Sequence, residues 1–280
     1  MIGSTVSTIG GLPMGFRNGI EMGCECIQMY LTPSRTWVAQ PPHADRITSF
    51  TNEWKKWPNL QVISHAPIIM NLASANAEVR QKSQDRLHTE IMTASALGVR
   101  TLVIHLGANQ SRELGEQLAI ESLKAAVTLA ERNNVQILIE NTAGQGNALG
   151  LTGSELNAIL QEFDQGAPIG LCLDTCHLFA AGYELRGYKG YTNTMTQLES
   201  EMDLNRVGVI HINDSKHPLG SRRDRHASIG RGQIGIQFFH AITRDDRFAS
   251  IPKITELEPA LARESLETLR KLRETVALTL

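Results

Sequence analysis

The sequence lacks the features that mark several large classes of protein. Its 27 lysines and arginines are balanced by 29 aspartates and glutamates, so it has no excess of the positive charge that is typical of many nucleic-acid binders. No apolar run approaches the ~18 residues of a membrane span. Hydrophobic residues make up 41% of the 280 residues, with no low-complexity linker, which excludes a disordered or collagen-like chain. We therefore expect a single domain over residues 1–280 with no membrane partner.

Cysteine is scarce, and its spacing fits no common cysteine motif. The four cysteines form the pairs Cys24/Cys26 and Cys172/Cys176, which match neither a CxxC redox pair nor a zinc ribbon. The first 16 residues contain no lysine or arginine, unlike a targeting peptide. We expect a reduced, cytoplasmic protein whose cysteines belong to the core.

What the sequence does contain is a regular alternation of short apolar runs and longer amphipathic stretches. This alternation is typical of repeated βα units, and thus of the α/β class with a parallel sheet. Helices are predicted over 77–97, closing at Gly98, and over 113–132. Roughly eight strands favour a TIM (β/α)8 barrel, which typically needs ~250 residues, and an open doubly wound sheet stays the alternative. The predicted strands cover residues 2–7, 24–30, 61–65, 100–105, 136–140, 169–174, 207–212 and 252–257.

One segment is expected to form an enlarged loop. Residues 183–203 are polar and aromatic and lie between two predicted strands. Loops at the C-terminal ends of barrel strands are where barrels build their sites.

The predicted strands repeatedly end in a histidine or a carboxylate. Because the C-terminal ends of barrel strands meet at one mouth, these side chains would crowd together there. Uncompensated crowding costs several kcal/mol through desolvation and like-charge repulsion, and divalent cations are the simplest compensation. The strand-end residues are His65, His105, Glu140, Asp174, His211 and Glu256, with His177 three residues after Asp174, and the loop motif RRDRH adds Asp224 and His226.

The types of these residues indicate the kind of metal. Five imidazoles and four carboxylates, with no thiolate among them, suit zinc, manganese or iron in open catalytic sites better than a closed structural zinc site. They exceed what one ion needs, so two or three ions are implied. Asp224 and His226 lie two residues apart, which places both side chains on one side of an extended loop and suits a chelate.

Two glycine-rich segments match nucleotide-binding motifs only in part. Residues 230–235 read GRGQIG, a formal GxGxxG, but they follow an arginine-rich loop rather than a strand. Gly144 and Gly146 do follow a predicted strand, yet Leu149 stands where the third glycine should be. We therefore expect no nucleotide cofactor.

Six sequence blocks run nearly from end to end of the chain. They are SHAP (64–67), IHLG (104–107), ENTAGQG (140–146), LDTCHLFAAGYEL (173–185), HINDSK (211–216) and GSRRDRHASIGRGQIG (220–235). Together they resemble those of endonuclease IV, the metal-dependent apurinic/apyrimidinic endonuclease family also called deoxyribonuclease IV. A match of this extent and order is specific.

The resemblance implies a xylose-isomerase-like TIM barrel with three Zn2+ at the C-terminal face of its strands, where Mn2+ or Fe2+ can replace zinc at one or more sites. Glu140 would bridge two ions and act as the catalytic carboxylate. The last ligand is placed at Glu256, and Glu258, two residues on, would point to the same face of a strand and stays the alternative. The implied ligand sets are His65, His105 and Glu140 for one ion, Glu140, Asp174, His211 and Glu256 for the second, and His177, Asp224 and His226 for the third.

The implied activity is hydrolysis of a DNA phosphodiester bond on the 5′ side of an abasic site, in base excision repair. The products would be a 3′-hydroxyl and a 5′-deoxyribose phosphate, and blocked 3′ ends could also be cleared. The implied partner is double-stranded DNA with an abasic or 3′-blocked lesion, bound by a monomer. An abasic nucleotide has no stacked base to lose, so it can be swung into a pocket cheaply.

The resemblance also suggests which residues would contact DNA, since the family wedges side chains into the duplex. Arg35, in the block TPSRTW, matches the position of one inserted residue. Ile68 stands where the family usually has a tyrosine wedge, and Thr5 stands where it commonly has a histidine. Positive charge in the loop that carries Asp224 and His226 would meet phosphates, and it comes from Lys216, Arg222, Arg223, Arg225 and Arg231.

Two other functions remain open from the sequence. One is a sugar isomerase or epimerase of the xylose-isomerase-like barrels, which uses similar strand-end ligands on fewer metals. Such an enzyme does not need ligands for a third ion, which His177, Asp224 and His226 would supply. The other is a damage-binding protein that has lost turnover. Thr5 and Ile68, which differ from the residues common in the family, favour this alternative.

Overall fold

The computed structural model describes residues 1–275 and shows a closed barrel of eight parallel strands. The order around the barrel is β1-β10-β7-β6-β5-β4-β3-β2, so the first and last strands pair and close it. The prediction of a TIM barrel is confirmed, and the open doubly wound sheet is wrong. The strands are β1 (Ile2–Thr5), β2 (Cys26–Met29), β3 (Gln61–His65), β4 (Thr101–Ile104), β5 (Gln136–Glu140), β6 (Ile169–Asp174), β7 (Val207–His211) and β10 (Lys253–Thr255).

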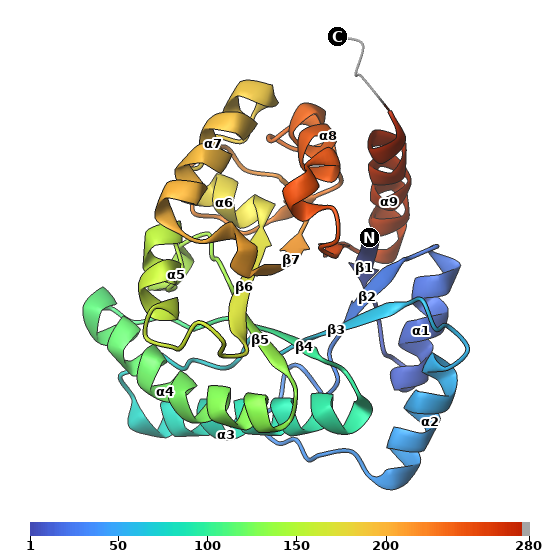
Figure 1. Cartoon of the computed structure of the whole chain (residues 1–280), viewed down its shortest axis with the longest axis vertical. Helices are drawn as coiled ribbons and strands as arrows, with labels where there is room; N and C mark the ends of the chain where they lie inside the picture. Colours follow the sequence, from blue (N-terminus) through green and yellow to red (C-terminus); the bar gives the residue numbers. More distant parts are fainter. Residues whose placement is uncertain (276–280) are drawn as a thin grey trace.

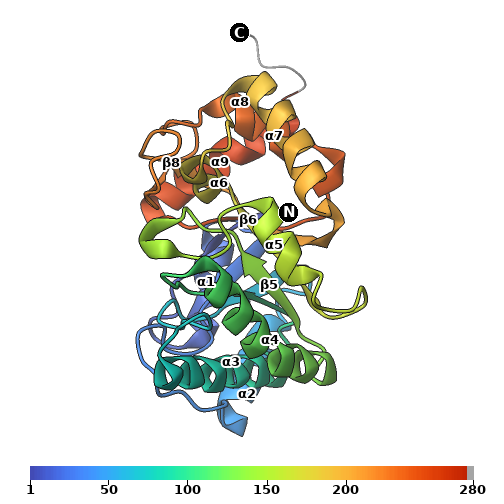
Figure 2. The same ribbon diagram turned by 90° about the vertical axis from the view of Figure 1, so that its left-hand side faces the viewer.

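Helices surround the strands (Figure 1). The helix predicted over 77–97 is α3, which begins after Asn76, whose side chain accepts from the backbone of Glu78, and ends at Gly98, whose φ of 79° lies in the left-handed region. α3 and α4 lie side by side, as Figure 2 also shows. The helices are α1 (Leu12–Glu21), α2 (Ala44–Trp54), α3 (Ala77–Leu97), α4 (Arg112–Arg132), α5 (Gly153–Leu160), α6 (Thr175–Ala181), α7 (Gly187–Glu201), α8 (Ile236–Arg244) and α9 (Pro259–Glu274). Within the described residues, no helix is long and apolar enough to cross a membrane.

The expectation of an enlarged loop over 183–203 is wrong, because most of that segment is helix α7. Its buried side chains include Tyr191, Met195 and Leu198, which recur every three to four residues and so form one apolar face. This face packs toward α5 and α8. The extra element after β6 is instead the short helix α6.

The barrel interior holds an apolar layer to which seven of the strands contribute one side chain each. Cys26 and Cys172 belong to this layer, and all four cysteines are buried and free, so the prediction of core cysteines is confirmed. On β1 the equivalent position is Gly3, where an added Cβ would lie 1.6 Å from the Cys26 carbonyl oxygen. The layer comprises Cys26, Ile63, Val103, Leu138, Cys172, Val209 and Ile254.

Candidate metal centre

A ring of eight polar side chains lies beyond the apolar layer, two residues further along each strand. Because successive side chains of a strand alternate in direction, a residue two places on points the same way. His65 follows Ile63, and Asp174 follows Cys172, in this manner. The strand ends thus aim their side chains into one mouth. The ring comprises Thr5, Gln28, His65, His105, Glu140, Asp174, His211 and Glu256.

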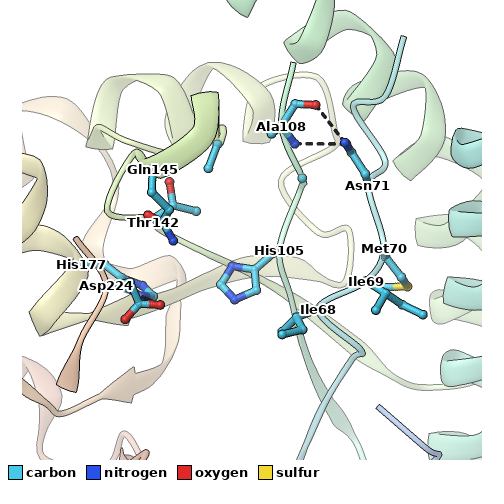
Figure 3. Close-up of a pocket in the computed structure, with 12 residues that line it drawn as sticks. Ile68, Ile69, Met70, Asn71, His105, Ala108, Thr142, Gln145, His177 and Asp224 are labelled. Atoms are coloured by element: carbon cyan, nitrogen blue, oxygen red, sulfur yellow. Dashed lines mark hydrogen bonds and ion pairs between the residues drawn. The ribbon is translucent and has the colours of Figure 1, made fainter. Parts of the chain in front are cut away.

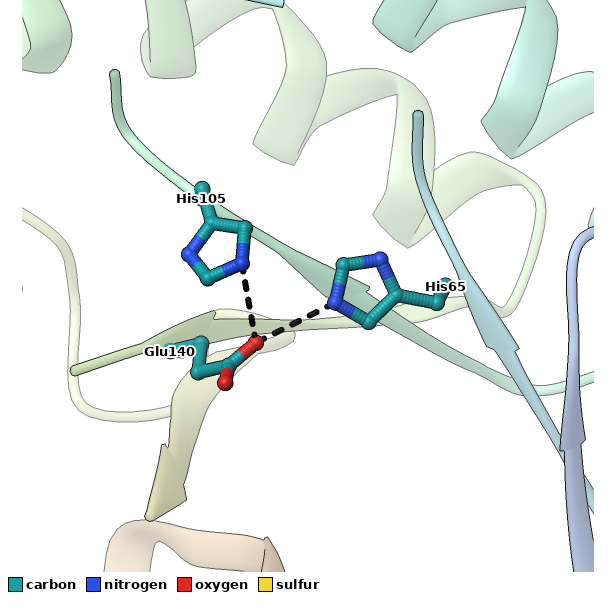
Figure 4. Close-up of side chains that lie close together, drawn as sticks. All are labelled: His65, His105 and Glu140. Atoms are coloured by element: carbon teal, nitrogen blue, oxygen red, sulfur yellow. Dashed lines mark hydrogen bonds and ion pairs between the residues drawn. The ribbon is translucent and has the colours of Figure 1, made fainter. Parts of the chain in front are cut away.

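Glu140 is the shared carboxylate of this ring and is only 1% exposed. Its Oε2 lies 3.1 Å from His65 Nε2 and 3.2 Å from His105 Nε2 (Figure 4). Its Oε1 lies 3.0 Å from His211 Nδ1. Burial opposes ionisation, but the neighbouring His211 and His105 hold the pKa of Glu140 well below its usual range. The carboxylate is therefore charged and faces ligand nitrogens with both oxygens.

Two groups of potential ligands share Glu140. In the first, atoms of His65, His105 and Glu140 all lie within 4.8 Å of one another, and in the second the same holds for Glu140, Asp174, His211 and Glu256. Glu256 Oε2 lies 3.3 Å from His211 Nδ1. Glu258 is exposed at the N-terminal boundary of α9 and joins none of the groups found in residues 1–275.

A third group combines the start of α6 with a loop after β7. Asp174 caps α6 by accepting from the backbone N–H of His177 at 2.7 Å. The two-residue strands β8 (Asp214–Ser215) and β9 (His226–Ala227) form a small antiparallel ribbon that brings His226 to the mouth. Asp174, His177 and His226 are within 4.8 Å of one another. Asp224 lies beside them, with its oxygens 3.2 Å from His177 Nε2 and 3.1 Å from His226 Nε2.

Two buried nitrogens show that this arrangement suits a cation. Nε2 of His177 and Nε2 of His226 are buried and have no hydrogen-bond partner among residues 1–275, although carboxylate oxygens are close by. Such contacts without hydrogen-bond geometry are what side chains converging on a common ion would produce. In the metal-free protein, burial disfavours protonation of His226, but Asp174 and Asp224 outweigh it and raise the pKa to about 9.

The thiols at the mouth are poor ligands in comparison. Cys176 lies close enough to Asp224 and His226 to complete another possible group. However, burial raises the pKa of Cys176 to about 12, and its Sγ contacts the carbonyl oxygen of Arg225 at 3.7 Å. A thiol must be deprotonated to bind zinc tightly, so the imidazole and carboxylate set is the better one.

Gln28 is a residue of the site that sequence reasoning missed. It is fully buried, and its Oε1 lies 2.8 Å from His211 Nε2. Its Nε2 donates to Glu256 Oε1 at 2.9 Å and to Thr5 Oγ1 at 3.0 Å. The signal that could have found it is the two-residue step from Cys26, since the same step links the other six members of the apolar layer to ring residues.

The residues expected to contact DNA differ in their exposure and in their partners. Arg35 and Ile68 are on the loops after β2 and β3 and are exposed. Ile68 lines a cleft of about 450 Å³ together with His105, His177 and Asp224 (Figure 3). Lys216 and Arg225 are exposed on the ribbon and its loop, whereas Arg231 forms an ion pair of 3.1 Å with Glu264.

The GRGQIG segment encloses a carboxylate of the protein itself. Asp214 accepts from the backbone N–H of Gly230 at 3.1 Å, of Gly232 at 3.0 Å and of Ile234 at 2.9 Å. Asp214 is fully buried. These donors are therefore engaged by Asp214.

A model of the xylose isomerase-like TIM barrel family matches residues 16–272. The chain is also 37% identical to the probable endonuclease 4 of Halorhodospira halophila, an alignment that covers 91% of this chain and 87% of that protein. The chain belongs to the endonuclease IV family. The probable endonuclease 4 of Aquifex aeolicus is 34% identical over 91% of each chain.

Solved structures agree with membership of the endonuclease IV family. The crystal structure of endonuclease IV from Thermus thermophilus matches with a TM-score of 0.83 and 28% identity, covering 96% of this chain and 97% of that one. A D-tagatose 3-epimerase-like protein matches with a TM-score of 0.75 and 19% identity over 97% of both chains. At 19% identity the match to the epimerase-like protein shows a common fold only, and it gives no evidence about activity.

Proposed function

We propose that this protein is a zinc-dependent endodeoxyribonuclease that hydrolyses the DNA backbone on the 5′ side of an abasic site, in base excision repair. The observation that carries the proposal is the set of imidazoles and carboxylates around Glu140, extended by Asp224 and His226 beyond what one or two ions need. Membership of the endonuclease IV family supports the same substrate class. The products would be a 3′-hydroxyl and a 5′-deoxyribose phosphate.

Three Zn2+ would be held by the ligand groups described above, with Mn2+ or Fe2+ as replacements at one or more sites. Such ions, when bound, supply Lewis acidity toward a phosphate and lower the pKa of bound water to about 7. Glu140 would serve the first two groups, because its two oxygens face His65 and His105 on one side and His211 on the other. Asp224 would join His177 and His226, with Asp174 close enough to share the third position.

The cluster would also change the charge that DNA meets. The chain alone has a formal net charge of −2, and three divalent ions add +6, which gives +4. The added charge lies at the mouth, where a phosphate would bind. The near-neutral composition therefore fits local attraction of one phosphate group better than a broad basic surface.

Recognition of the lesion would depend on the loops around the mouth. Ile68 lines the cleft, and Arg35 is exposed on the loop after β2; both would enter the gap left by the missing base. Lys216 and Arg225 would meet backbone phosphates. Arg231 would do so only after releasing Glu264, so we expect it to contribute less.

The direct test is incision of a duplex that carries one tetrahydrofuran abasic analogue by the zinc-loaded protein. We expect a single nick 5′ to the analogue, which Glu140→Gln abolishes together with part of the bound zinc. Glu53→Gln is the matched control, because Glu53 is a buried carboxylate on α2 that pairs with Lys56 and lies outside the ligand groups. Absence of incision at every zinc, manganese and iron loading would sink the proposal. Tight binding without incision would identify a damage-binding protein, and epimerisation of a ketose without incision would identify a sugar enzyme.

A further inference from the structure

The loop between β2 and α2 is held in place almost entirely by side chains of other elements. Within the described part of the chain, residues 31–42, called the arm below, take part in no backbone-to-backbone hydrogen bond. The arm carries Arg35, and it also exposes Trp37 (39%) and Val38 (79%). Its conformation therefore depends largely on side chains of other elements, such as Arg46 and Arg86.

Arg86, on α3, supplies most of those external contacts. Its side chain is the largest of the fully buried ones, at 2% exposure. Nη1 donates to the carbonyl oxygen of Thr36 at 2.6 Å, and Nη2 donates to that of Pro33 at 2.9 Å and to the hydroxyl of Thr32. The guanidinium group thus spans the backbone on both sides of Arg35.

Glu90, one helical turn after Arg86, fixes the guanidinium from behind. Its Oε1 accepts from Arg86 Nε at 2.8 Å and also from the hydroxyl of Thr32. Both charged groups are 1% exposed. A buried ion pair of this kind is seldom the most stabilising choice for a core, because desolvation cancels much of the attraction. What this pair does supply is a fixed geometry for three polar groups of the arm.

We propose that Arg86, oriented by Glu90, is a positioning residue that holds the arm so that Arg35 is presented to DNA at the barrel mouth. The inference rests on the proposed function, since the role of Arg35 belongs to it. Holding the arm in advance removes the ordering cost that a free loop would pay on binding. The effect should therefore appear in substrate binding and not in the chemical step.

The test compares Arg86→Met/Glu90→Gln with wild type. The double substitution avoids the buried unpaired carboxylate that Arg86→Met alone would leave, so the variant is expected to fold. Arg206→Met is the matched control, because Arg206 donates to the carbonyl oxygens of Leu160 and Ile169 near the N-terminal end of the strands, away from the arm. On the abasic duplex we expect KM to rise about tenfold in the double variant, with kcat and bound zinc unchanged.

A second readout follows the arm directly. Trypsin can cut the chain after Arg35. Cutting after Arg223, in the loop between β8 and β9, serves as the internal reference. We expect the Arg35 cut to accelerate in the double variant and not in Arg206→Met. Adding Arg35→Ala to the double variant should raise KM no further than Arg35→Ala alone, because both changes act on one contact.

The outcomes separate this inference from the proposed function. An unchanged rate of cutting after Arg35, or a KM effect that persists in full when Arg35 is alanine, would overturn the positioning role of Arg86. A wild-type protein that neither binds nor nicks the abasic duplex would overturn the proposed function and with it the role of Arg35. In that case the digestion would still show whether Arg86 holds the arm.

Discussion

Gln28 Oε1 lies 2.8 Å from Nε2 of His211, opposite the ring nitrogen that faces Glu140 and Glu256. The amide oxygen can only accept, so the proton of the neutral imidazole is on Nε2 and the lone pair is on Nδ1. Partners of this kind orient metal-binding histidines, and their removal typically costs ~10–100-fold in metal affinity.

Gln28→Leu should therefore weaken one zinc site by about 10–100-fold and leave the others intact. Competition with a chromophoric chelator measures this. Thr5→Ala is the control, because Thr5 accepts from Gln28, whereas the polar partners of His211 within residues 1–275 are Gln28, Glu140 and Glu256. Equal zinc affinity in Gln28→Leu and wild type would contradict the role assigned to the amide.

Zinc uptake should release protons near neutral pH. Asp174 and Asp224 outweigh burial and raise the pKa values of His177 and His226, that of His226 to about 9, so both rings are protonated in the metal-free protein. Because a metal needs the neutral imidazole, zinc affinity should rise with pH up to about 9. Titration calorimetry in two buffers of different ionisation enthalpy counts the protons.

The metal-free protein should respond to pH in the opposite way. A histidine whose pKa is raised by folding stabilises the folded protein fully at a pH below its pKa in the unfolded chain, ~6.5. The stabilisation is lost as the pH rises to the pKa of the histidine in the folded protein. For His226 that interval ends at about pH 9. The melting temperature of chelator-treated wild type, compared with that of His226→Asn, should therefore decrease as pH rises through this interval. If it does not decrease, the His226 ring is not protonated there.

Gly232→Ala should destabilise the protein by about 1–3 kcal/mol through overpacking. An added Cβ would lie 2.4 Å from the Ser215 carbonyl oxygen and 2.5 Å from Asp214 Oδ1, inside the turn that surrounds the carboxylate. Gly166→Ala is the matched control, since nothing lies within 4 Å of its added Cβ. Urea denaturation compares the two, and similar midpoints would refute the tight enclosure of Asp214.

Lys253 makes a separate prediction for alkaline pH. Burial lowers the pKa of this amine to about 8, and its Nζ donates to the carbonyl oxygen of Phe248 at 2.5 Å. Protonation in the folded state is thus costly below pH 8, and the cost disappears as pH rises toward the unfolded value of ~10.4. Between pH 8 and 10 the free energy of unfolding of wild type should therefore increase by a few kcal/mol relative to that of Lys253→Met. A constant difference between the two denaturation curves would refute the low pKa.

Ile68→Ser should change substrate binding without changing stability. The side chain is 65% exposed, so the free energy of unfolding should move by less than about 0.5 kcal/mol. If Ile68 enters the duplex, KM for the abasic substrate should rise several-fold, whereas Leu261→Ser on α9, at 41% exposure, should leave KM unchanged. Equal KM values in both variants would remove Ile68 from the DNA-binding surface.

The barrel and most of the ring were predictable because each strand carries a local signal. A β-branched or apolar run that ends in His65, His105 or Glu140 shows both where the strand stops and what its last inward side chain is. Gln28 escaped notice because a glutamine inside a strand looks like an ordinary polar position, and only the closed barrel shows what it faces.

Other features could not be seen because they depend on contacts between distant segments. Arg86 lies in a helix rich in charges, where an arginine normally faces solvent, and its burial depends on an arm 50 residues earlier in the chain. The helix over 187–201 was missed because the polar and aromatic residues of the segment concealed the apolar face of Tyr191, Met195 and Leu198.

The strand that closes the barrel also delivers the last ring residue. β10 lies between β1 and β7, and Glu256 follows it directly. During synthesis every other ring residue leaves the ribosome before Glu256. The His65, His105 and Glu140 group comes from the ends of β3, β4 and β5, whereas the group that includes Glu256 also needs β10 in its place. Full occupancy of the mouth would then be a mark of a closed barrel.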